Sequence, residues 1–265
     1  MAFIAGDPNR VPRIAEKMKN PVELSRYRGL VSYRAHTPGG VGVTVATSGM
    51  GTPSTLIVVE ELAKLGAKCI IRIGTCGGVN PEMNTGDVLV PYGAVRDDLC
   101  STNYAPLQYP AVASPEVYQA LVSSISTLLP ADRVRTGIVW STDIYYDRRD
   151  GNPLNVWTRC RVAGIEMESS LLFVFAESQG IRAGSILACD GNLHRDPKLE
   201  QKDEAEKSGE QNPLLVEAVD KEIEAAIRAV DRLYSSNSAS TESQAKSSPQ
   251  PSPTPEARAG RKKKR

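Results

Sequence analysis

The sequence predicts an α/β fold, a single domain whose central sheet is largely covered by helices. Short apolar runs of strand length alternate with longer segments of helical apolar spacing, and this alternation is typical of α/β proteins. Glycine or a charged residue follows several of the apolar runs directly, as at Gly6, Arg72 and Asp190. Because ligands of α/β sheets collect at the carboxyl ends of the strands, these segments also locate a candidate site.

The first third of the chain supplies five expected elements. Residues 2–5 are an apolar run that predicts a buried strand, and Pro8 ends it because proline lacks the N–H that a strand ladder needs. Residues 11–18 have the apolar spacing of a helix, which we expect over 8–19. Two strands near 29–36 and 41–48 and a helix over 53–66 follow.

The rest of the domain continues the alternation. A second short apolar run, Cys69-Ile70-Ile71, predicts a strand over 68–74, and the run Ile186-Leu187-Ala188-Cys189 predicts another over 183–190. The other expected elements are strands over 87–95 and 135–141 and helices over 115–128, 167–179 and 213–234. No internal repeat is visible, so residues 1–234 are expected to form one domain.

Two of the strand ends carry features that suit an oxyanion. Gly6 has no Cβ, so its backbone can approach a phosphate closely, and Arg10 lies near the start of the next helix, where the helix dipole favours an anion. An ordinary strand-turn-helix with a solvated arginine is the alternative. Arg72 ends its strand and is followed by Gly74-Thr75-Cys76-Gly77-Gly78, which we expect to be a loop of bare backbone N–H groups.

A buried arginine at position 72 needs either a carboxylate partner or a bound anion. An internal Arg–Glu bridge is therefore the structural alternative to phosphate binding. The glycines do not form a P-loop, because no Lys-Ser or Lys-Thr follows them, and their spacing is not that of a dinucleotide fingerprint.

Six ordered motifs resemble a known family. They are Gly6-Asp7-Pro8-x-Arg10, Tyr27-Arg28-Gly29, Ser48-Gly49-Met50-Gly51-Thr52-Pro53-Ser54, Glu60-Glu61-Leu62, Arg72-x-Gly74-Thr75-Cys76-Gly77 and Glu166-Met167-Glu168. In order and approximate spacing they resemble the nucleoside phosphorylases that form trimers of dimers, which include purine nucleoside phosphorylase and uridine phosphorylase. The resemblance covers residues 2 to about 234 and implies a mixed, twisted central sheet flanked by helices.

The resemblance implies an enzyme that splits a ribonucleoside with inorganic phosphate into ribose 1-phosphate and free base, without metal or organic cofactor. It implies that Gly6, Arg10, Arg72 and Thr75 bind phosphate and that Arg28 completes the site of a neighbouring subunit in a dimer or hexamer. Three guanidiniums would bind the phosphate dianion and offset the charge that develops on the ribosyl ring.

Ribose and base contacts are implied in the same way. Met50, Met167 and Glu168 match ribose-binding positions, where the carboxylate accepts hydrogen bonds from the 2′- and 3′-hydroxyls. Glu168 is alternatively a helix N-terminal carboxylate stabilised by the dipole. Tyr145 matches an aromatic that stacks on the base, and the remaining implied base contacts are Cys76, Gly77, Ile165 and Glu166.

The identity of the base rests on two segments. Asp190, followed by Gly191, resembles the aspartate that protonates N7 of a departing purine, although the alignment is uncertain by one residue and Asp-Gly is also a common turn. Uridine phosphorylases usually have a Gly-Gln-x-Arg element after the stacking aromatic, whereas this chain has Asp147-Arg148-Arg149-Asp150-Gly151. We therefore expect a purine nucleoside phosphorylase, with Asp190 catalytic and uridine phosphorylase as the alternative.

Two other function classes stay open. A nucleosidase would use water and would have no need of the three arginines at positions 10, 28 and 72. A catalytically inactive nucleoside-binding protein is the alternative from another class, because family members usually carry a leading segment whose histidine contacts the ribose 5′ end. Here the first strand begins at residue 2.

Composition favours a cytoplasmic enzyme. The 265 residues are 40% hydrophobic, contain no apolar stretch near the roughly 20 residues that span a bilayer, and begin without a signal-peptide pattern. The five cysteines are expected to be reduced thiols, and no Cys or His spacing suggests zinc. A net charge of +1 argues against a nucleic-acid partner.

Two further segments are expected to lie outside the packed domain. Residues 235–265 are rich in Ser, Pro, Thr and Gln and are predicted to be a disordered tail. The tail ends in the basic run 261–265, which is also compatible with a nuclear localisation signal. The charged residues 195–211 are expected to form a loop that covers the base as a lid.

Overall fold

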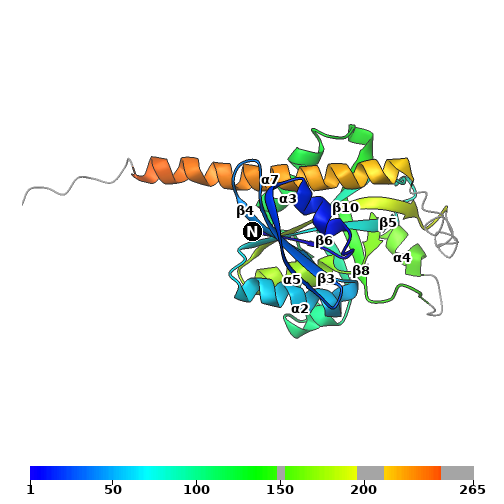
Figure 1. Ribbon diagram of the computed structural model, residues 1–265. Helices are drawn as coiled ribbons and strands as arrows, with labels where there is room; N and C mark the ends of the chain where they lie inside the picture. Colours follow the sequence, from blue (N-terminus) through cyan, green and yellow to red (C-terminus); the bar gives the residue numbers. More distant parts are fainter. Residues whose placement is uncertain (148–152, 196–211, 246–265) are drawn as a thin grey trace, which may run out of the picture.

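A ten-stranded mixed sheet is the centre of the molecule (Figure 1). The computed structural model describes residues 1–147, 153–195 and 212–245. The strands are β1 (Ala2–Ala5), β2 (Lys19–Tyr27), β3 (Leu30–His36), β4 (Gly42–Thr47), β5 (Cys69–Gly78), β6 (Val88–Asp97), β7 (Ala111–Val112), β8 (Val134–Thr142), β9 (Gly164–Glu166) and β10 (Arg182–Asn192). The single-domain α/β architecture expected from the sequence is confirmed.

The helices cover both faces of the sheet. They are α1 (Arg10–Glu16), α2 (Gly51–Lys64), α3 (Pro115–Ile125), α4 (Pro153–Arg159), α5 (Ser169–Ser178) and α7 (Pro213–Ala245), with short 3-10 turns at Cys100–Asn103 and Ala131–Arg133. Figure 1 shows α3 and α7 on one side of the sheet and α2 and α5 on the other. None of the helices within the described ranges is long and apolar enough to cross a lipid bilayer.

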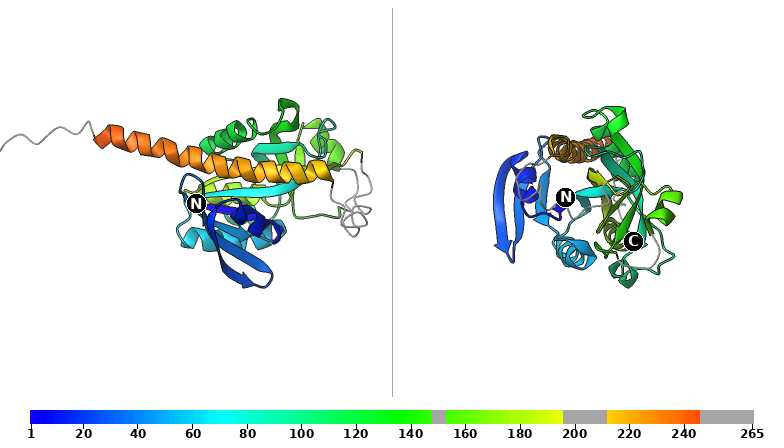
Figure 2. Two further views of the ribbon diagram at one scale, coloured as in Figure 1. Left: turned by 45° about the horizontal axis from the view of Figure 1, so that its top comes forward. Right: turned by 90° about the vertical axis from the view of Figure 1, so that its right-hand side faces the viewer.

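The sheet has a closed part and an open wing. Nine of its strands follow the order β10-β6-β8-β9-β5-β1-β4-β3-β2, and β7 pairs with β6 beside this path. Strand β10 also pairs in parallel with β5, which closes a ring of five strands. From β5 the sheet continues through the parallel neighbours β1 and β4 and ends in the antiparallel hairpin of β3 and β2. Figure 2 shows this blue hairpin at the outer side of the molecule, so it projects away from the closed ring.

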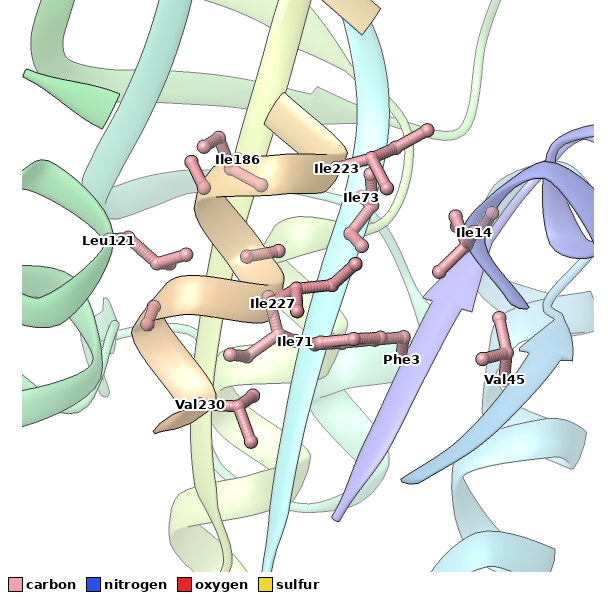
Figure 3. Packing of buried hydrophobic residues seen from close by; sticks show 14 of the residues in the cluster. Phe3, Ile14, Val45, Ile71, Ile73, Leu121, Ile186, Ile223, Ile227 and Val230 are labelled. Carbon is pink, nitrogen blue, oxygen red and sulfur yellow. The ribbon is translucent and has the colours of Figure 1, made fainter. Parts of the chain in front are cut away.

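The larger hydrophobic core lies between the sheet and the layer of α1, α3 and α7. Figure 3 shows Ile223 and Ile227 of α7 packed over Ile71 and Ile73 of β5, with Phe3 of β1 beside them. These side chains are almost fully buried, and a buried side chain of this size contributes roughly 1.5–3 kcal/mol. The packing holds the carboxyl end of β1, which precedes Gly6, beside Arg72 in the middle of β5.

A two-residue turn joins β2 and β3. Tyr27 pairs with Leu30, and both residues of the turn have positive φ, 54° at Arg28 and 77° at Gly29. Two positive φ values in a two-residue hairpin turn suit the twist of the flanking strands. The sequence did not predict β2, because all nine of its residues are exposed and lack an apolar alternation; pairing with β3 alone determines it.

Other boundaries differ from expectation for identifiable reasons. Strand β5 continues to Gly78, so the expected loop of bare N–H groups after Arg72 is wrong: residues 74–78 pair with β10, and Gly77 and Gly78 also pair with β9. Helix α7 runs to Ala245 rather than 234, and no proline or glycine interrupts residues 235–248. The expected lid over 195–211 lies outside the described residues except for Arg195, as does the tail beyond 245.

Candidate active site

One cleft brings together every residue that the sequence predicted to contact phosphate, ribose or base. It has a volume of about 1480 Å³ and opens where β1, β5 and β10 end. Its lining includes the four positions expected to bind phosphate within one chain, together with Arg28 and the expected ribose and base contacts: Gly6, Arg10, Arg28, Met50, Arg72, Thr75, Cys76, Gly77, Tyr145, Ile165, Glu166, Met167, Glu168 and Asp190. Residues far apart in sequence therefore meet in one place.

Close backbone packing forms the cleft wall at Gly6. A Cβ added there would lie 3.2 Å from the carbonyl oxygen of Gly49, so the end of β1 and the turn after β4 are nearly in contact. Gly49 has φ +71°, and a Cβ at this position would overlap the Ser54 hydroxyl. Such backbone favours glycine, and it leaves the Gly6 backbone open towards the cleft.

Arg10 is the first residue of α1, lines the cleft and contacts β5. Its Nη1 donates to the carbonyl of Ile73 at 3.3 Å, and the side chain is 11% exposed. The guanidinium therefore lies in a restricted position, with donors left for a further acceptor in the cleft.

Arg72 lies at the centre of a buried ion-pair network. Its Nε donates to Glu166 at 2.9 Å and its Nη2 lies 2.6 Å from Glu168. A Cβ at Gly74 would lie 2.6 Å from the Arg72 guanidinium carbon, so only glycine there leaves room for the side chain along the strand. The internal Arg–Glu bridge that the sequence left as an alternative is present. It does not exclude phosphate, because Arg72 also lines the cleft.

The electrostatics of Arg72 follow from this pairing. Burial lowers the pKa of the guanidinium, but the Glu168 and Glu166 carboxylates outweigh that effect and raise its pKa. Burial raises the pKa of Glu168 above its usual value, and Arg72 offsets only part of that rise. One cation thus stabilises two buried carboxylates, and loss of the cation would leave both uncompensated.

Glu166 and Glu168 differ in how much of their acceptor capacity the protein uses. Glu166 accepts hydrogen bonds from Arg72, the hydroxyl of Ser141, the N–H of Glu168, and both the N–H and hydroxyl of Ser169. Glu168 accepts from the N–H of Gly51 at 2.7 Å and pairs with Arg72. A carboxylate has about four lone-pair sites, so Glu168 retains capacity for hydroxyl groups and Glu166 is largely occupied.

Strands β5 and β10 both contribute residues to the cleft lining, among them Cys76 and Asp190. Cys76 and Cys189 are register partners on these strands, and the Cys189 side chain and then burial raise the pKa of the Cys76 thiol well above its usual value. Cys76 is therefore a neutral wall residue and not a nucleophile. The pairing of β10 with β5 shifts register between Cys189 and Gly191, which is the irregularity that brings Asp190 into the cleft lining.

The cleft rim carries exposed side chains. Met50 is 84% exposed, and Tyr145 is 61% exposed and packs edge-to-face on Tyr146 with ring centroids 4.9 Å apart. Arg28 lies at the hairpin tip, with its guanidinium 5.6 Å from the ring centroid of Tyr27. These groups are accessible to a ligand or to another subunit, as the family resemblance implies.

The sequence missed one charged residue next to the cleft. Glu222 lies on α7 with a fully buried side chain, 4.0 Å from Nη1 of Arg10. Its sequence position carried a signal: it follows Val219 by three residues and precedes Ala226 by four, on the apolar stripe of the helix. A carboxylate at such a position is unusual.

Comparisons with known proteins agree with the geometry. The family model described as the phosphorylase superfamily matches residues 1–228. The chain is 39% identical over 199 residues to the uridine phosphorylases of Salmonella typhimurium and of Escherichia coli K12, covering 70% of this chain and 78% of each relative. It is 34% identical over 194 residues to the guanosine phosphorylase of Halorubrum lacusprofundi, covering 73% of this chain and 78% of the relative. The chain therefore belongs to the nucleoside phosphorylase family within the phosphorylase superfamily.

Proposed function

We propose that this nucleoside phosphorylase acts on uridine, and that phosphate binds between Gly6, Arg10, Arg72 and Thr75. The observation that carries the phosphate site is the convergence of these four positions, from β1, α1 and β5, on one cleft. The preference for uridine is supported by relatives such as those of Salmonella and Escherichia coli, which are named uridine phosphorylases. Uridine replaces the purine that we expected from Asp190.

The proposed reaction needs no group beyond the two substrates. A phosphate oxygen forms a bond to C1′ of the ribose while the C1′–N bond breaks and its electron pair leaves with the base, which then takes up a proton. Arg10 and Arg72 orient the phosphate and offset the charge that develops on the ribosyl ring. Glu168 accepts hydrogen bonds from the ribose hydroxyls, and Met50 and Met167 contact the apolar face of the sugar.

The base would lie against Tyr145, between Ile165 and the β5–β10 wall formed by Cys76 and Gly77. Stacking on Tyr145 provides affinity for either base class. The expected role of Glu166 as a base contact is less favoured than a positioning role, because protein donors occupy its oxygens. The segment 148–152, where a uracil-reading element would follow Tyr145, lies outside the described residues.

Purine nucleoside phosphorolysis is the second candidate, and Asp190 is the observation that favours it. The side chain is partly buried in the cleft lining at a strand irregularity, which is where an acid could protonate N7 of a purine. The similarity to a protein named guanosine phosphorylase supports the same candidate.

Substrate assays separate these candidates. The protein should be incubated with uridine, inosine and methylthioadenosine, each with and without phosphate, and the release of free base measured. We expect phosphate-dependent turnover of uridine. Turnover of inosine but not uridine would indicate a purine nucleoside phosphorylase. Hydrolysis at an equal rate without phosphate would indicate a nucleosidase. No turnover would indicate a nucleoside-binding protein.

The variant Asp190→Ala tests whether a base-protonating acid is used. If uridine is the natural substrate, we expect its kcat to change by less than about threefold, while any inosine activity falls by about 10²-fold because a general acid is lost. Initial rates on both nucleosides measure this. Equal losses on the two substrates would show that Asp190 supports the cleft structure and does not act on N7.

We further propose that the active form is a homo-oligomer, a dimer or hexamer, in which Arg28 at the hairpin tip completes a neighbour's site in the cytoplasm. Arg28 is exposed at the tip of the β2–β3 hairpin and also lines the cleft of its own chain. The hairpin lies at the outer edge of the sheet (Figure 2), where another subunit could pack against it. Gel filtration with activity measured across the peak tests this proposal. An active monomer would contradict it.

A further inference from the structure

Glu222 is a buried carboxylic acid directly behind the proposed phosphate site. Its neighbour on α7, Ile223, packs beside Ile73 of β5 (Figure 3), and the carbonyl of Ile73 accepts the hydrogen bond from Arg10. The Glu222 side chain is 0% exposed and its Oε1 lies 4.0 Å from Nη1 of Arg10. Arg10 lines the cleft and Glu222 does not, so the Arg10 guanidinium contacts both the cleft and a buried carboxyl group.

The carboxyl group of Glu222 has little support from hydrogen-bond donors among the described residues. Neither Oε1 nor Oε2 has a hydrogen-bond partner there, and the backbone amide of Ala188 on β10 lowers the pKa of Glu222 by less than Arg10 does. The charged groups that face it are Arg10 and Arg13 from α1 and Arg72 from β5. All three arginines line the cleft.

A buried carboxyl group without donors is costly, and an apolar side chain of similar volume would fill the same space without that cost. The surrounding core of α7 consists of such side chains, among them Val219 and Ala226. Packing alone therefore does not account for a glutamate at position 222. The three nearby arginines indicate instead that the group acts on the anion site.

We propose that Glu222 is a positioning residue for phosphate binding. It contacts the Arg10 guanidinium, and its own charge state sets how much net positive charge Arg10 presents to phosphate in the cleft. The proposal rests on the proposed function only in that Arg10 binds phosphate. It assigns to α7, which contributes no charged group to the cleft lining among the described residues, a role in the affinity for the inorganic substrate.

The protonation state of Glu222 determines whether it leaves phosphate binding unchanged or weakens it. Burial raises its pKa to about 8, and Arg10 and Arg72 offset only part of that effect. At neutral pH the group therefore holds a proton and leaves the positive charge of Arg10 available to phosphate. Above pH 8 it ionises, competes with phosphate for Arg10, and weakens phosphate binding. Because phosphate brings negative charge close by, bound phosphate should in turn favour the protonated form.

The experiment measures the KM for phosphate and the KM for nucleoside between pH 6.5 and 9 in the full chain. Glu222→Gln keeps the shape but cannot ionise, so we expect it to retain the wild-type KM for phosphate at pH 6.5. At pH 9 the wild-type KM for phosphate should exceed that of the variant by at least about fivefold, because two unit charges about 4 Å apart interact this strongly even in bulk water and more strongly inside a protein. The ionisation of phosphate itself cancels in this comparison.

Two further variants complete the test. Glu222→Met removes the polar group that lies 4.0 Å from Arg10, and we expect a KM for phosphate roughly tenfold higher than that of Glu222→Gln at every pH, with an unchanged KM for nucleoside. Glu224→Gln is the matched control, because Glu224 is an exposed residue of the same helix that pairs with Lys221 and Arg228. Its profile should follow the wild type.

Equal KM values for phosphate in wild type and Glu222→Gln across the pH range would overturn the proposal, as would equal rises in both KM values in Glu222→Met. If Glu222→Met does not fold, the pH profile of Glu222→Gln decides alone. Failure of the proposed function looks different: Arg10→Ala would then leave the KM for phosphate unchanged, or the wild type would not require phosphate.

Discussion

Arg72→Ala is expected to be the most damaging single substitution in this protein. It removes a cation that faces the cleft and is also the partner of Glu166 and Glu168 at 2.9 and 2.6 Å. Loss of a group that stabilises transition-state charge typically costs about 10²–10³ in kcat. Breaking a buried ion pair costs about 3–5 kcal/mol of stability. Phosphorolysis rates and thermal unfolding measure the two effects separately.

A second substitution separates catalysis from stability. In Arg72→Ala combined with Glu166→Gln, one of the two uncompensated carboxylates is neutral, so part of the lost stability should return. Activity should not return, because the guanidinium is still absent from the cleft. If activity recovered together with the melting temperature, Arg72 would be a structural residue and the phosphate site would need to be placed elsewhere.

Glu168→Gln is expected to have the second largest effect, on ribose recognition. Its carboxylate is oriented by the N–H of Gly51 and by Arg72, and it faces the cleft with acceptor capacity left over. A hydrogen bond to a charged group contributes about 1.5–3 kcal/mol, so kcat/KM for uridine should fall about 10- to 150-fold. The fall should be smaller for 2′-deoxyuridine, which lacks one of the two hydroxyls.

Glu166→Gln is the matched control for this measurement. Glu166 shares Arg72 with Glu168, but its own oxygens are occupied by Ser141, Ser169 and the backbone. It should lower the melting temperature while leaving the ratio of kcat/KM between uridine and 2′-deoxyuridine as in the wild type. A ratio that changes in Glu166→Gln and stays constant in Glu168→Gln would reverse the roles of the two carboxylates.

Much of the site could be predicted from local sequence. Gly6, Arg10, Arg72, Thr75 and Asp190 stand at or just beyond the ends of apolar runs, and strands that pair side by side bring such ends together. The glycines in these segments mark places where a side chain would collide with a neighbour. Gly74 is one of them, because it leaves room for the Arg72 guanidinium. The family resemblance predicts which of these positions contact phosphate, ribose and base, and those roles stay predictions.

Some features have no local signal because they depend on partners distant in sequence. Strand β2 is exposed along its whole length and exists through pairing with β3. Residues 74–78 look like a loop until β10 and β9 supply ladder partners on both sides. The glutamates at 166 and 168 look equivalent until hydrogen bonds from Ser141 and Ser169 occupy one of them.

The sequence by itself determined the α/β class, the family and the set of residues around the cleft, because apolar periodicity and short motifs are local properties. Only the tertiary structure decided which side chain meets which: that Arg72 is shared by two carboxylates, and that Glu222 of the C-terminal helix lies behind Arg10. Burial and charge pairing depend on distances between segments that the chain order does not contain. They set the pKa of Glu222 and the free acceptor capacity of Glu168.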